Sequence, residues 1–253
     1  MVRGGRPKIA EFAGALSDTL TRLGAEVVPP GGDVTPDMVL GVGGDGTMLA
    51  AARIALGHDV PVLGFNLGTL GFLTEAEPSD LEAVLPRLLA GDYEVEERMT
   101  VSARVADREE IGLNDVVIEK IDTTRLVSLD VVIDGSHLTT QRADGLIIAT
   151  PTGSTAYSFS ARGPLLDPTM EALVVTPVAA HSLFDRSIVV PGSSVIAVTI
   201  TQDRKVRVNV DKGGLGTLGE GDKVEIRAGE RRSLFVALEE RSFASLIREK
   251  FGL

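Results

Sequence analysis

The sequence predicts an α/β domain followed by a β-rich domain. The apolar run Val39–Val42 leads into a group of glycines, and an alanine-rich helical segment follows from Met48 to Leu56, which is the order strand, tight loop, helix. Val60–Phe65 is a short, continuous apolar run, as expected for a parallel strand covered on both faces. After residue 94, short polar and apolar steps separated by turn residues replace the helical spacing, which is typical of a β-rich domain.

In the first domain, apolar residues at helical spacing predict helices over Ile9–Leu23 and Pro78–Leu89. Gly24 and Gly91 are suited to end these helices, because glycine readily adopts the left-handed conformation that closes a helix. Ala25–Val28 is expected to form a short strand before a run of prolines and glycines. Together these elements predict a Rossmann-like open sheet, in which ligands bind at the carboxyl ends of the strands.

The domain boundaries are expected near residues 97 and 235. Residues 1–97 then form the α/β domain, 98–235 the β-rich domain and 236–253 a C-terminal segment, in which Phe243–Phe251 regains helical spacing. The turn pairs Asp134-Gly135 and Gly221-Asp222 fit hairpins of the β-rich domain. The runs expected to form its strands are Asp115–Glu119, Leu126–Ile133, Gly145–Ala149, Leu173–Pro177, Ser194–Thr201, Lys205–Val210, Lys223–Ala228 and Ser233–Val236.

Composition limits the classes of partner. The 253 residues carry 36 acidic and 25 basic side chains, a net charge of −11, which argues against a general nucleic-acid binder and against binding to an anionic membrane surface. There is no cysteine, hence no disulfide or thiolate metal site, and His58, His137 and His181 lack the spacing of a zinc site. Without an apolar signal core or spanning segment, a soluble cytoplasmic protein is expected.

The loop Gly41-x-Gly43-x-x-Gly46 is the first candidate site. Its glycines let the backbone approach a phosphate closely, and the helix that follows directs N–H groups and a partial positive charge at the loop. Asp45 would repel a phosphate, so this carboxylate is expected to hold a metal ion or to accept a proton from an attacking hydroxyl. Either role indicates phosphoryl transfer, whereas the alternative is a solvated aspartate in an Asp-Gly turn.

Three further segments are candidates for ligand binding, each with a structural alternative. The loop Asn66–Thr74 follows a strand and contains glycines, although it could be a connector. Asn114-Asp115 could bind a ribose or a base edge, or form an Asx turn at the start of a strand. The segment Arg142–Pro164 contains a strand, many small hydroxyl side chains and Tyr157, with a helix expected over Thr155–Ala161; its alternative is a polar loop.

Taken together, these segments resemble the NAD kinases. Gly43-Gly44-Asp45-Gly46-Thr47 alone is shared with diacylglycerol and sphingosine kinases and, more loosely, with phosphofructokinases. The segment Thr152–Tyr157 and the Asn114-Asp115 pair separate the NAD kinases from those relatives. The resemblance covers about residues 38–235. It implies a C-terminal segment that returns to the first domain, and it implies transfer of the ATP γ-phosphoryl group, or of polyphosphate, to the adenosine 2′-hydroxyl of NAD.

The resemblance also implies roles for individual residues. Asp45 is implied as the general base, and Mg²⁺ or another divalent cation is implied to accompany ATP without a dedicated protein metal site. The implied phosphate-binding residues are Gly43, Gly44, Gly46 and Thr47. The implied NAD-binding residues are Asp45, Gly46, Asn66, Phe72, Asn114, Asp115, Arg142, Asp144, Thr155, Ala156, Tyr157 and Ser160.

Arg142 and Asp144 are implied to reach the nicotinamide end, often across a subunit interface, so a homodimer or homotetramer is expected. One departure concerns Lys212-Gly213-Gly214, where many bacterial members carry a small residue and then Gln near the dinucleotide. By the resemblance, the chain is also expected to lack the N-terminal regulatory extension of longer members.

Two other functions stay open on the sequence alone. One is a lipid kinase of the same superfamily, although the acidic charge argues against it, as does Thr47-Met48-Leu49-Ala50, where those kinases usually carry an Asn-Glu pair. The other is a nucleotide-binding sensor that is not an enzyme, although the presence of Asp45 argues against it.

Overall fold

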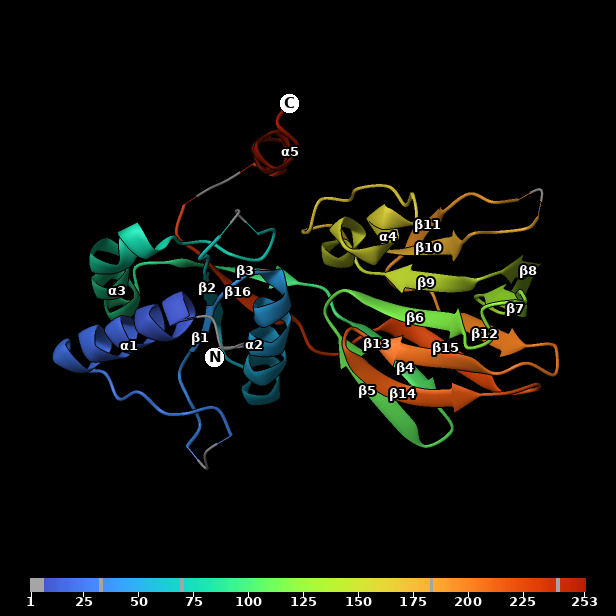
Figure 1. Cartoon of the computed structure of the whole chain (residues 1–253), viewed down its shortest axis with the longest axis horizontal. Helices are drawn as coiled ribbons and strands as arrows, with labels where there is room; N and C mark the ends of the chain where they lie inside the picture. The colour runs from blue at the N-terminus through green and yellow to red at the C-terminus, as the bar shows by residue number, and fades with distance from the viewer. Residues whose placement is uncertain (1–6, 32–33, 69–70, 183, 240–241) are drawn as a thin grey trace. The chain divides into compact units, whose positions relative to one another are not determined.

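A computed structural model describes residues 7–31, 34–68, 71–182, 184–239 and 242–253. The chain forms two compact units. The first ends at Glu97 and resumes with Ser233–Leu253, and the second is Arg98–Arg232. This is the expected class of an α/β unit, a β-rich unit and a terminal helix in the first unit (Figure 1).

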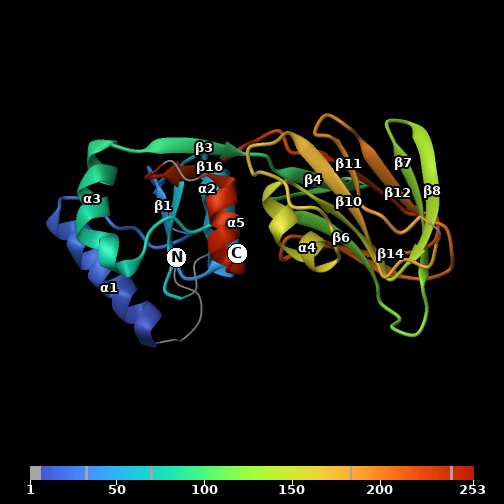
Figure 2. The same cartoon turned by 90° about the horizontal axis from the view of Figure 1, so that it is seen from above.

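The first unit is built on a four-stranded sheet in the order β1–β2–β16–β3. Parallel pairing joins β2 to β1 and to β16. Helices α1 and α3 lie on one face of this sheet and α2 on the other, as Figures 1 and 2 show. The bounds are α1 Pro7–Arg22, β1 Val39–Val42, α2 Asp45–His58, β2 Val62–Phe65, the 3-10 turn η1 Pro78–Asp80, α3 Leu81–Ala90, β3 Glu94–Arg98, β16 Ser233–Ala237 and α5 Phe243–Phe251.

Two glycines allow α2 to pack closely on the sheet. Gly41 of β1 and Gly64 of β2 are register partners, and a Cβ at either position would lie 2.5 Å from Met48 Sδ. Met48 is fully buried there, and Ala51, one helical turn along α2, is fully buried as well. The small residues of both elements therefore place the start of α2 directly beside the end of β1.

The second unit consists of two six-stranded sheets with antiparallel pairing. Their orders are β11–β10–β9–β6–β13–β14 and β5–β4–β15–β12–β7–β8, and the inward-facing valines, leucines and isoleucines form one core. The bounds are β4 Val101–Val105, β5 Arg108–Gly112, β6 Asp115–Lys120, β7 Val127–Ile133, β8 Ser136–Ala143, β9 Gly145–Ala149, the 3-10 turn η2 Thr152–Thr155, α4 Tyr157–Ser160, β10 Ala172–Val178, β11 Ile188–Pro191, β12 Ile196–Ile200, β13 Val206–Val210, β14 Gly213–Leu218 and β15 Lys223–Ala228.

Most of the expected elements are present, with three differences. Ala25–Val28 is not a strand: these residues have no regular secondary structure and join no sheet, and Val27 is exposed. The helix expected over Thr155–Ala161 is instead η2 and α4, because Ala156 departs from helical geometry with φ −100° and ψ −125°. Six strands were not among the runs expected from the sequence, namely β3, β4, β5, β8, β11 and β14.

Candidate active-site residues

The glycine loop of the first unit connects β1 to α2. Gly43 has φ +143°, which side chains rarely tolerate, and a Cβ there would lie 2.7 Å from Thr47 Oγ1. Gly44 is the N-cap of α2, and its carbonyl accepts the N–H of Thr47 at 2.8 Å. Gly44 is exposed and a Cβ at this position would meet open space. The loop therefore presents bare backbone at the positive end of a 14-residue helix, which suits an anion.

Asp45 joins this loop to the one that follows β2. It is the first residue of α2 and is half-buried. Its Oδ2 accepts the N–H of Phe72 and its Oδ1 accepts the N–H of Leu73, both at 3.2 Å. A Cβ at Gly71 would overlap Oδ1, so the loop backbone lies directly against the carboxylate. Asp45 is therefore not the solvated turn residue of the alternative interpretation but a carboxylate fixed in orientation by two backbone donors.

The loop after β2 is ordered by its own polar groups. The side-chain amide of buried Asn66 donates to the Gly68 carbonyl at 2.9 Å, and its Oδ1 accepts the N–H of Gly68 at 3.2 Å. Thr74 Oγ1 accepts the N–H of Gly71 at 3.0 Å. Thr69 and Leu70, which belong to the expected loop, lie outside the described residues. Asn66 is thus engaged within its loop, while the half-buried Phe72 is part of the turn that contacts Asp45.

In the second unit, Asp211 organises the segment that contains Asn114 and Asp115. Its two carboxylate oxygens accept the N–H groups of Leu113 and Asn114 at 2.8 Å and that of Asp115 at 3.2 Å. Asp211 itself has φ +50°, a conformation that aspartate tolerates better than most residues. Asp115 is 6% exposed, and burial, together with the nearby charge of Asp211, raises its pKa to about 7.

The turn after β9 lies against this same segment. Thr150 donates its N–H to the Asn114 carbonyl at 2.8 Å and its hydroxyl to the Leu113 carbonyl at 2.6 Å. A Cβ at Gly153 would overlap the Asn114 carbonyl, so only glycine fits. Within the described part of the chain, the buried atoms Asn114 Oδ1 and Thr152 Oγ1 have no hydrogen-bond partner. Buried polar atoms in this state are costly, and a ligand that hydrogen-bonds to them would remove the cost.

Tyr157 begins α4 and is an exposed side chain near several carboxyl groups. Desolvation, and then the charges of Glu119, Asp115 and Asp144, raise the pKa of its phenol. Three other expected residues border it in the chain: Thr155, whose hydroxyl donates to the Thr152 carbonyl at 3.0 Å, Ala156 and the exposed Ser160. The charges of Asp115 and Asp144 thus both act on the phenol of Tyr157.

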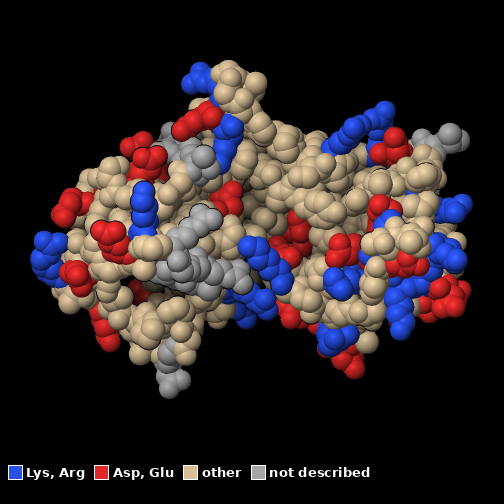
Figure 3. Space-filling model, viewed as in Figure 1, with Lys and Arg blue, Asp and Glu red and all other residues tan. Residues whose placement is uncertain are grey.

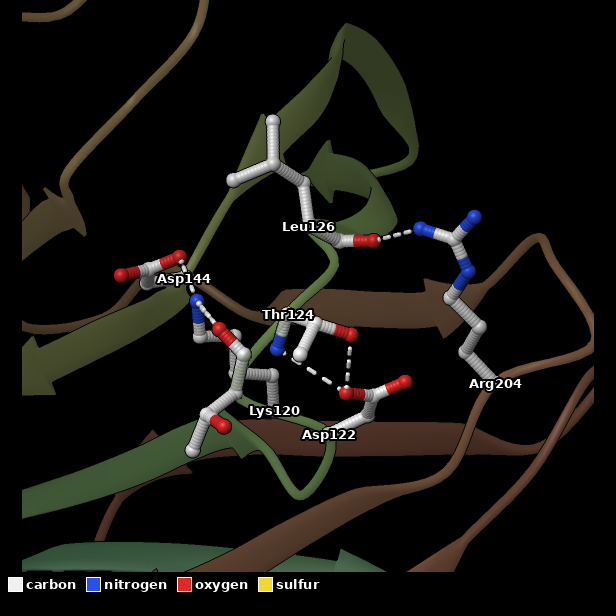
Figure 4. Close-up of polar contacts among 7 residues, drawn as sticks. Lys120, Asp122, Thr124, Leu126, Asp144 and Arg204 are labelled. Carbon is white, nitrogen blue, oxygen red and sulfur yellow. Dashed lines mark hydrogen bonds and ion pairs between the residues drawn. The ribbon is translucent and has the colours of Figure 1, made fainter.

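Asp144 pairs with a residue that the sequence did not single out. Figure 4 shows Lys120 Nζ bonded both to Asp144 and, at 3.1 Å, to the carbonyl of Thr123. The turn beside them is closed by Asp122, which accepts both donors of Thr124, and by a hydrogen bond from Arg204 to the Leu126 carbonyl. Arg142, expected to act with Asp144, is exposed, and its carbonyl accepts the N–H of His181 at 2.7 Å.

Sequence reasoning did not identify two residues that support the candidate site, Asp211 and Lys120. Asp211 is 96 to 98 positions away from the amides that it binds, and no local spacing reveals such a contact. Its position after a strand was visible in the sequence, but its left-handed backbone was not. Lys120 is the last residue of β6, whose first four residues are buried, and this pattern says nothing about the partner of a partly buried lysine at the strand end.

Neither a protein metal cage nor a membrane span is found in the described ranges. No three or more His, Cys, Asp or Glu side chains lie so as to hold an ion together, and no helix has both the length and the apolarity needed to cross a bilayer. On the face drawn in Figure 3, acidic and basic side chains are interspersed.

Comparison with known proteins gives a consistent result along the chain. Residues 26–93 match the family model of the ATP-NAD kinase N-terminal domain, and residues 113–238 match that of the ATP-NAD kinase C-terminal domain. The NAD kinase of Heliobacterium modesticaldum is 42% identical over 85% of this chain and 78% of its own length. The NAD kinase of Burkholderia orbicola is 38% identical over 98% of this chain and 90% of its own length.

Solved structures show the same similarity. An NAD kinase from Archaeoglobus fulgidus in complex with ATP has a TM-score of 0.80 and 28% identity, covering 95% of both chains. Yeast NADH kinase complexed with NADH has a TM-score of 0.78 and 29% identity, covering 86% of this chain and 67% of its own. A glycine-aspartate loop on an α/β unit, followed by this β-rich unit, defines a nucleotide-dependent kinase. The chain belongs to the NAD kinase family and is an enzyme of that family.

Proposed function

We propose that this enzyme transfers the γ-phosphoryl group of ATP to the 2′-hydroxyl of the adenosine ribose of NAD, with Asp45 as general base. The ribose 2′-oxygen forms a bond to the γ-phosphorus, the bond from that phosphorus to the β–γ bridging oxygen breaks, and ADP leaves. The hydroxyl proton passes to the Asp45 carboxylate. Because a ribose hydroxyl is far less acidic than a carboxylic acid, we expect this proton transfer to be late and to follow a loose transition state.

The observation that carries the proposal is the fixed carboxylate of Asp45 beside the glycine loop. Each of its oxygens accepts one backbone N–H, from Phe72 or Leu73, and each keeps a further lone pair for a substrate hydroxyl. A base that is already oriented loses little freedom when its substrate binds. The relatives solved with ATP and with NADH support ATP as the donor and a dinucleotide as the acceptor.

The donor phosphates are assigned to Gly43, Gly44, Gly46 and Thr47. The exposed backbone at Gly44 and the N-terminus of α2 are suited to bind them. Mg²⁺ in proteins is commonly bound by nucleotide phosphates and one or two carboxylates, so the single carboxylate of Asp45 fits a cation that arrives with ATP. When bound, the cation would offset the charge of the phosphates. Polyphosphate, which has the same chemistry, remains a second candidate donor.

NAD is assigned to residues of both units. In the second unit, the buried atoms Asn114 Oδ1 and Thr152 Oγ1 have no hydrogen-bond partner among the described residues and suit a hydrogen-bonding ligand. Asp115 and Tyr157, which belong to the same two chain segments, are proposed as further contacts. The remaining proposed contacts are Asp45, Gly46, Asn66, Phe72, Arg142, Asp144, Thr155, Ala156 and Ser160. The exposed Arg142 is proposed to act in a homodimer or homotetramer.

The direct test is to incubate the protein with ATP, Mg²⁺ and NAD and to measure NADP. We expect NADP to form, and we expect Asp45→Asn to lower kcat by orders of magnitude while NAD still binds. Replacing ATP by polyphosphate in the same assay decides between the two donors. Folded protein that yields no NADP with either donor would overturn the proposal, and loss of NAD binding in Asp45→Asn would make Asp45 a ligand contact instead of a base.

A further inference from the structure

The C-terminal helix α5 is well formed but contributes little to a core. Ser242 caps its N-terminus by accepting the N–H of Ser245 at 3.2 Å, and Gly252 closes its C-terminus with φ +65° and an N–H donated to the Arg248 carbonyl. No residue of the helix is buried. The helix is therefore capped at both ends although none of its residues is buried.

Two residues of the last turn of α5 contact the ring of Phe72. The ring of Phe251 lies 6.5 Å from the ring of Phe72, centroid to centroid, at an interplanar angle of 50°. Lys250 Nζ lies 5.0 Å from the centroid of the same ring. Both distances are within the range of favourable aromatic and cation–π interactions. The last turn of α5 therefore holds the side chain of Phe72 from two adjacent positions.

Phe72 in turn contacts the proposed base through its backbone. Its N–H donates to Asp45 Oδ2, and the next N–H, that of Leu73, donates to Oδ1. A fixed ring restricts the backbone that carries it, and these two N–H groups are the donors that orient the carboxylate. The contacts form a continuous path from the end of the chain to the Asp45 carboxyl group, entirely within the first unit.

We infer that Phe251 and Lys250 are positioning residues for phosphoryl transfer: by holding the ring of Phe72, they keep the N–H groups of Phe72 and Leu73 directed at Asp45. This inference rests on the proposed role of Asp45. Neither residue touches the reacting atoms, so removing them should loosen the base without abolishing the reaction. The effect is expected in kcat and in the order of the loop, and not in the KM for ATP.

The test compares Phe251→Ala and Lys250→Ala with two controls. Glu249→Ala changes an exposed residue of the same helix, and Leu253→Ala changes a residue that is 81% exposed beyond its end. We expect each test variant to lower kcat about two- to tenfold with the KM for ATP unchanged. The conservative variant Phe251→Tyr keeps the ring and should retain kcat, and the control variants should behave as the wild type.

Amide hydrogen exchange supplies a readout that does not depend on turnover. Exchange of the Phe72 and Leu73 N–H groups should be faster in Phe251→Ala than in the wild type or in Glu249→Ala, with the same Tm. If Phe251→Ala lowers the Tm, Lys250→Ala decides in its place. Wild-type kcat and wild-type exchange at these two amides would overturn the inference. Full turnover in Asp45→Asn would instead overturn the role of Asp45, so the two failures are distinguishable.

Discussion

The N–H of Asn114 donates a 2.8 Å hydrogen bond to Oδ1 of Asp211, across 97 positions of the sequence. The same carboxylate accepts the N–H groups of Leu113 and Asp115. Three consecutive backbone donors thus converge on one side chain at the start of β6. The orientation of Asn114, whose Oδ1 has no partner in the described residues, depends on this anchor.

Replacing Asp211 should therefore disturb both stability and dinucleotide binding. Asp211→Ala leaves three N–H groups without their acceptor, and each buried donor left unsatisfied costs about 1–3 kcal/mol. Alanine also tolerates the observed φ of +50° less well than aspartate or asparagine. We expect a large fall in the free energy of unfolding for Asp211→Ala, a smaller one for Asp211→Asn, and a raised KM for NAD in both, measured by urea unfolding and steady-state kinetics.

Asp134 offers the matched control for this prediction. It also has φ +50° and also accepts a backbone N–H, that of Val195 at 2.8 Å, but among the described residues its carboxylate accepts one backbone N–H where that of Asp211 accepts three. Asp134→Ala should cost less stability than Asp211→Ala and leave the KM for NAD unchanged. Equal effects of the two substitutions on stability and KM would show that Asp211 has no special role in the site.

The pKa of Asp115 predicts how stability depends on pH. Because the folded-state pKa is raised from 3.8 to about 7, the folded protein retains a proton that the unfolded chain loses between these values. The free energy of unfolding contributed by this group therefore falls as pH rises from about 4 to 7, by roughly 4 kcal/mol, and stays low above pH 7. Asp115→Asn, which cannot ionise, should be more stable than the wild type at pH 8 and lose that advantage at pH 4. Urea unfolding at both pH values measures this, and a stability difference that does not change with pH would contradict it.

Gly71 tests the contact between the two loops of the first unit. A Cβ at this position would overlap Asp45 Oδ1 and lie 2.9 Å from Thr74 Oγ1, so Gly71→Ala must move the loop or the carboxylate. Misplacing a catalytic group by about 1 Å can cost about a hundredfold in rate, and we expect a fall in kcat of that order. Gly68→Ala is the control, since a Cβ there would meet open space, and its kcat should match the wild type. A Gly71→Ala enzyme with wild-type kcat would show that this close approach is unimportant for turnover.

Five of the six strands that the sequence failed to predict share one property. β3 is an outer strand of the sheet of the first unit, and β5, β8, β11 and β14 are the four outer strands of the two sheets of the second unit; the exception is β4, which lies between β5 and β15. An edge strand is partly solvated and is commonly polar, short or rich in glycine: β8 is mostly exposed and β14 begins with Gly213-Gly214. Apart from β4, the inner strands of the second unit were predicted: β9 is a continuous apolar run, and β13 alternates apolar with polar residues. Hydrophobic pattern therefore reveals the centre of a sheet better than its edges.

The residues of the candidate site also fall into those that the sequence predicted and those that it did not. The glycine loop and Asp45 were predictable because the required backbone conformation and the charge lie within six residues. Ser233–Val236 was predicted as a strand of the β-rich domain, and the structure has it as β16, which pairs with β2 in the first unit. This pairing is a long-range contact that the pattern of the strand does not contain. Asp211 and the Lys120–Asp144 pair belong to the same category. The spacing of residues in the sequence shows which side chains are chemically suited to a site. The folded structure shows which residues far away in the sequence hold those side chains in place.

The most direct test of the account is a crystal structure of the protein with NAD bound, in which one distance is measured. The account predicts that an Asp45 carboxylate oxygen lies within hydrogen-bonding reach, roughly 2.6–3.2 Å, of the 2′-oxygen of the adenosine ribose. A carboxylate turned away from that oxygen, with neither a direct contact nor a single bridging water, would contradict it.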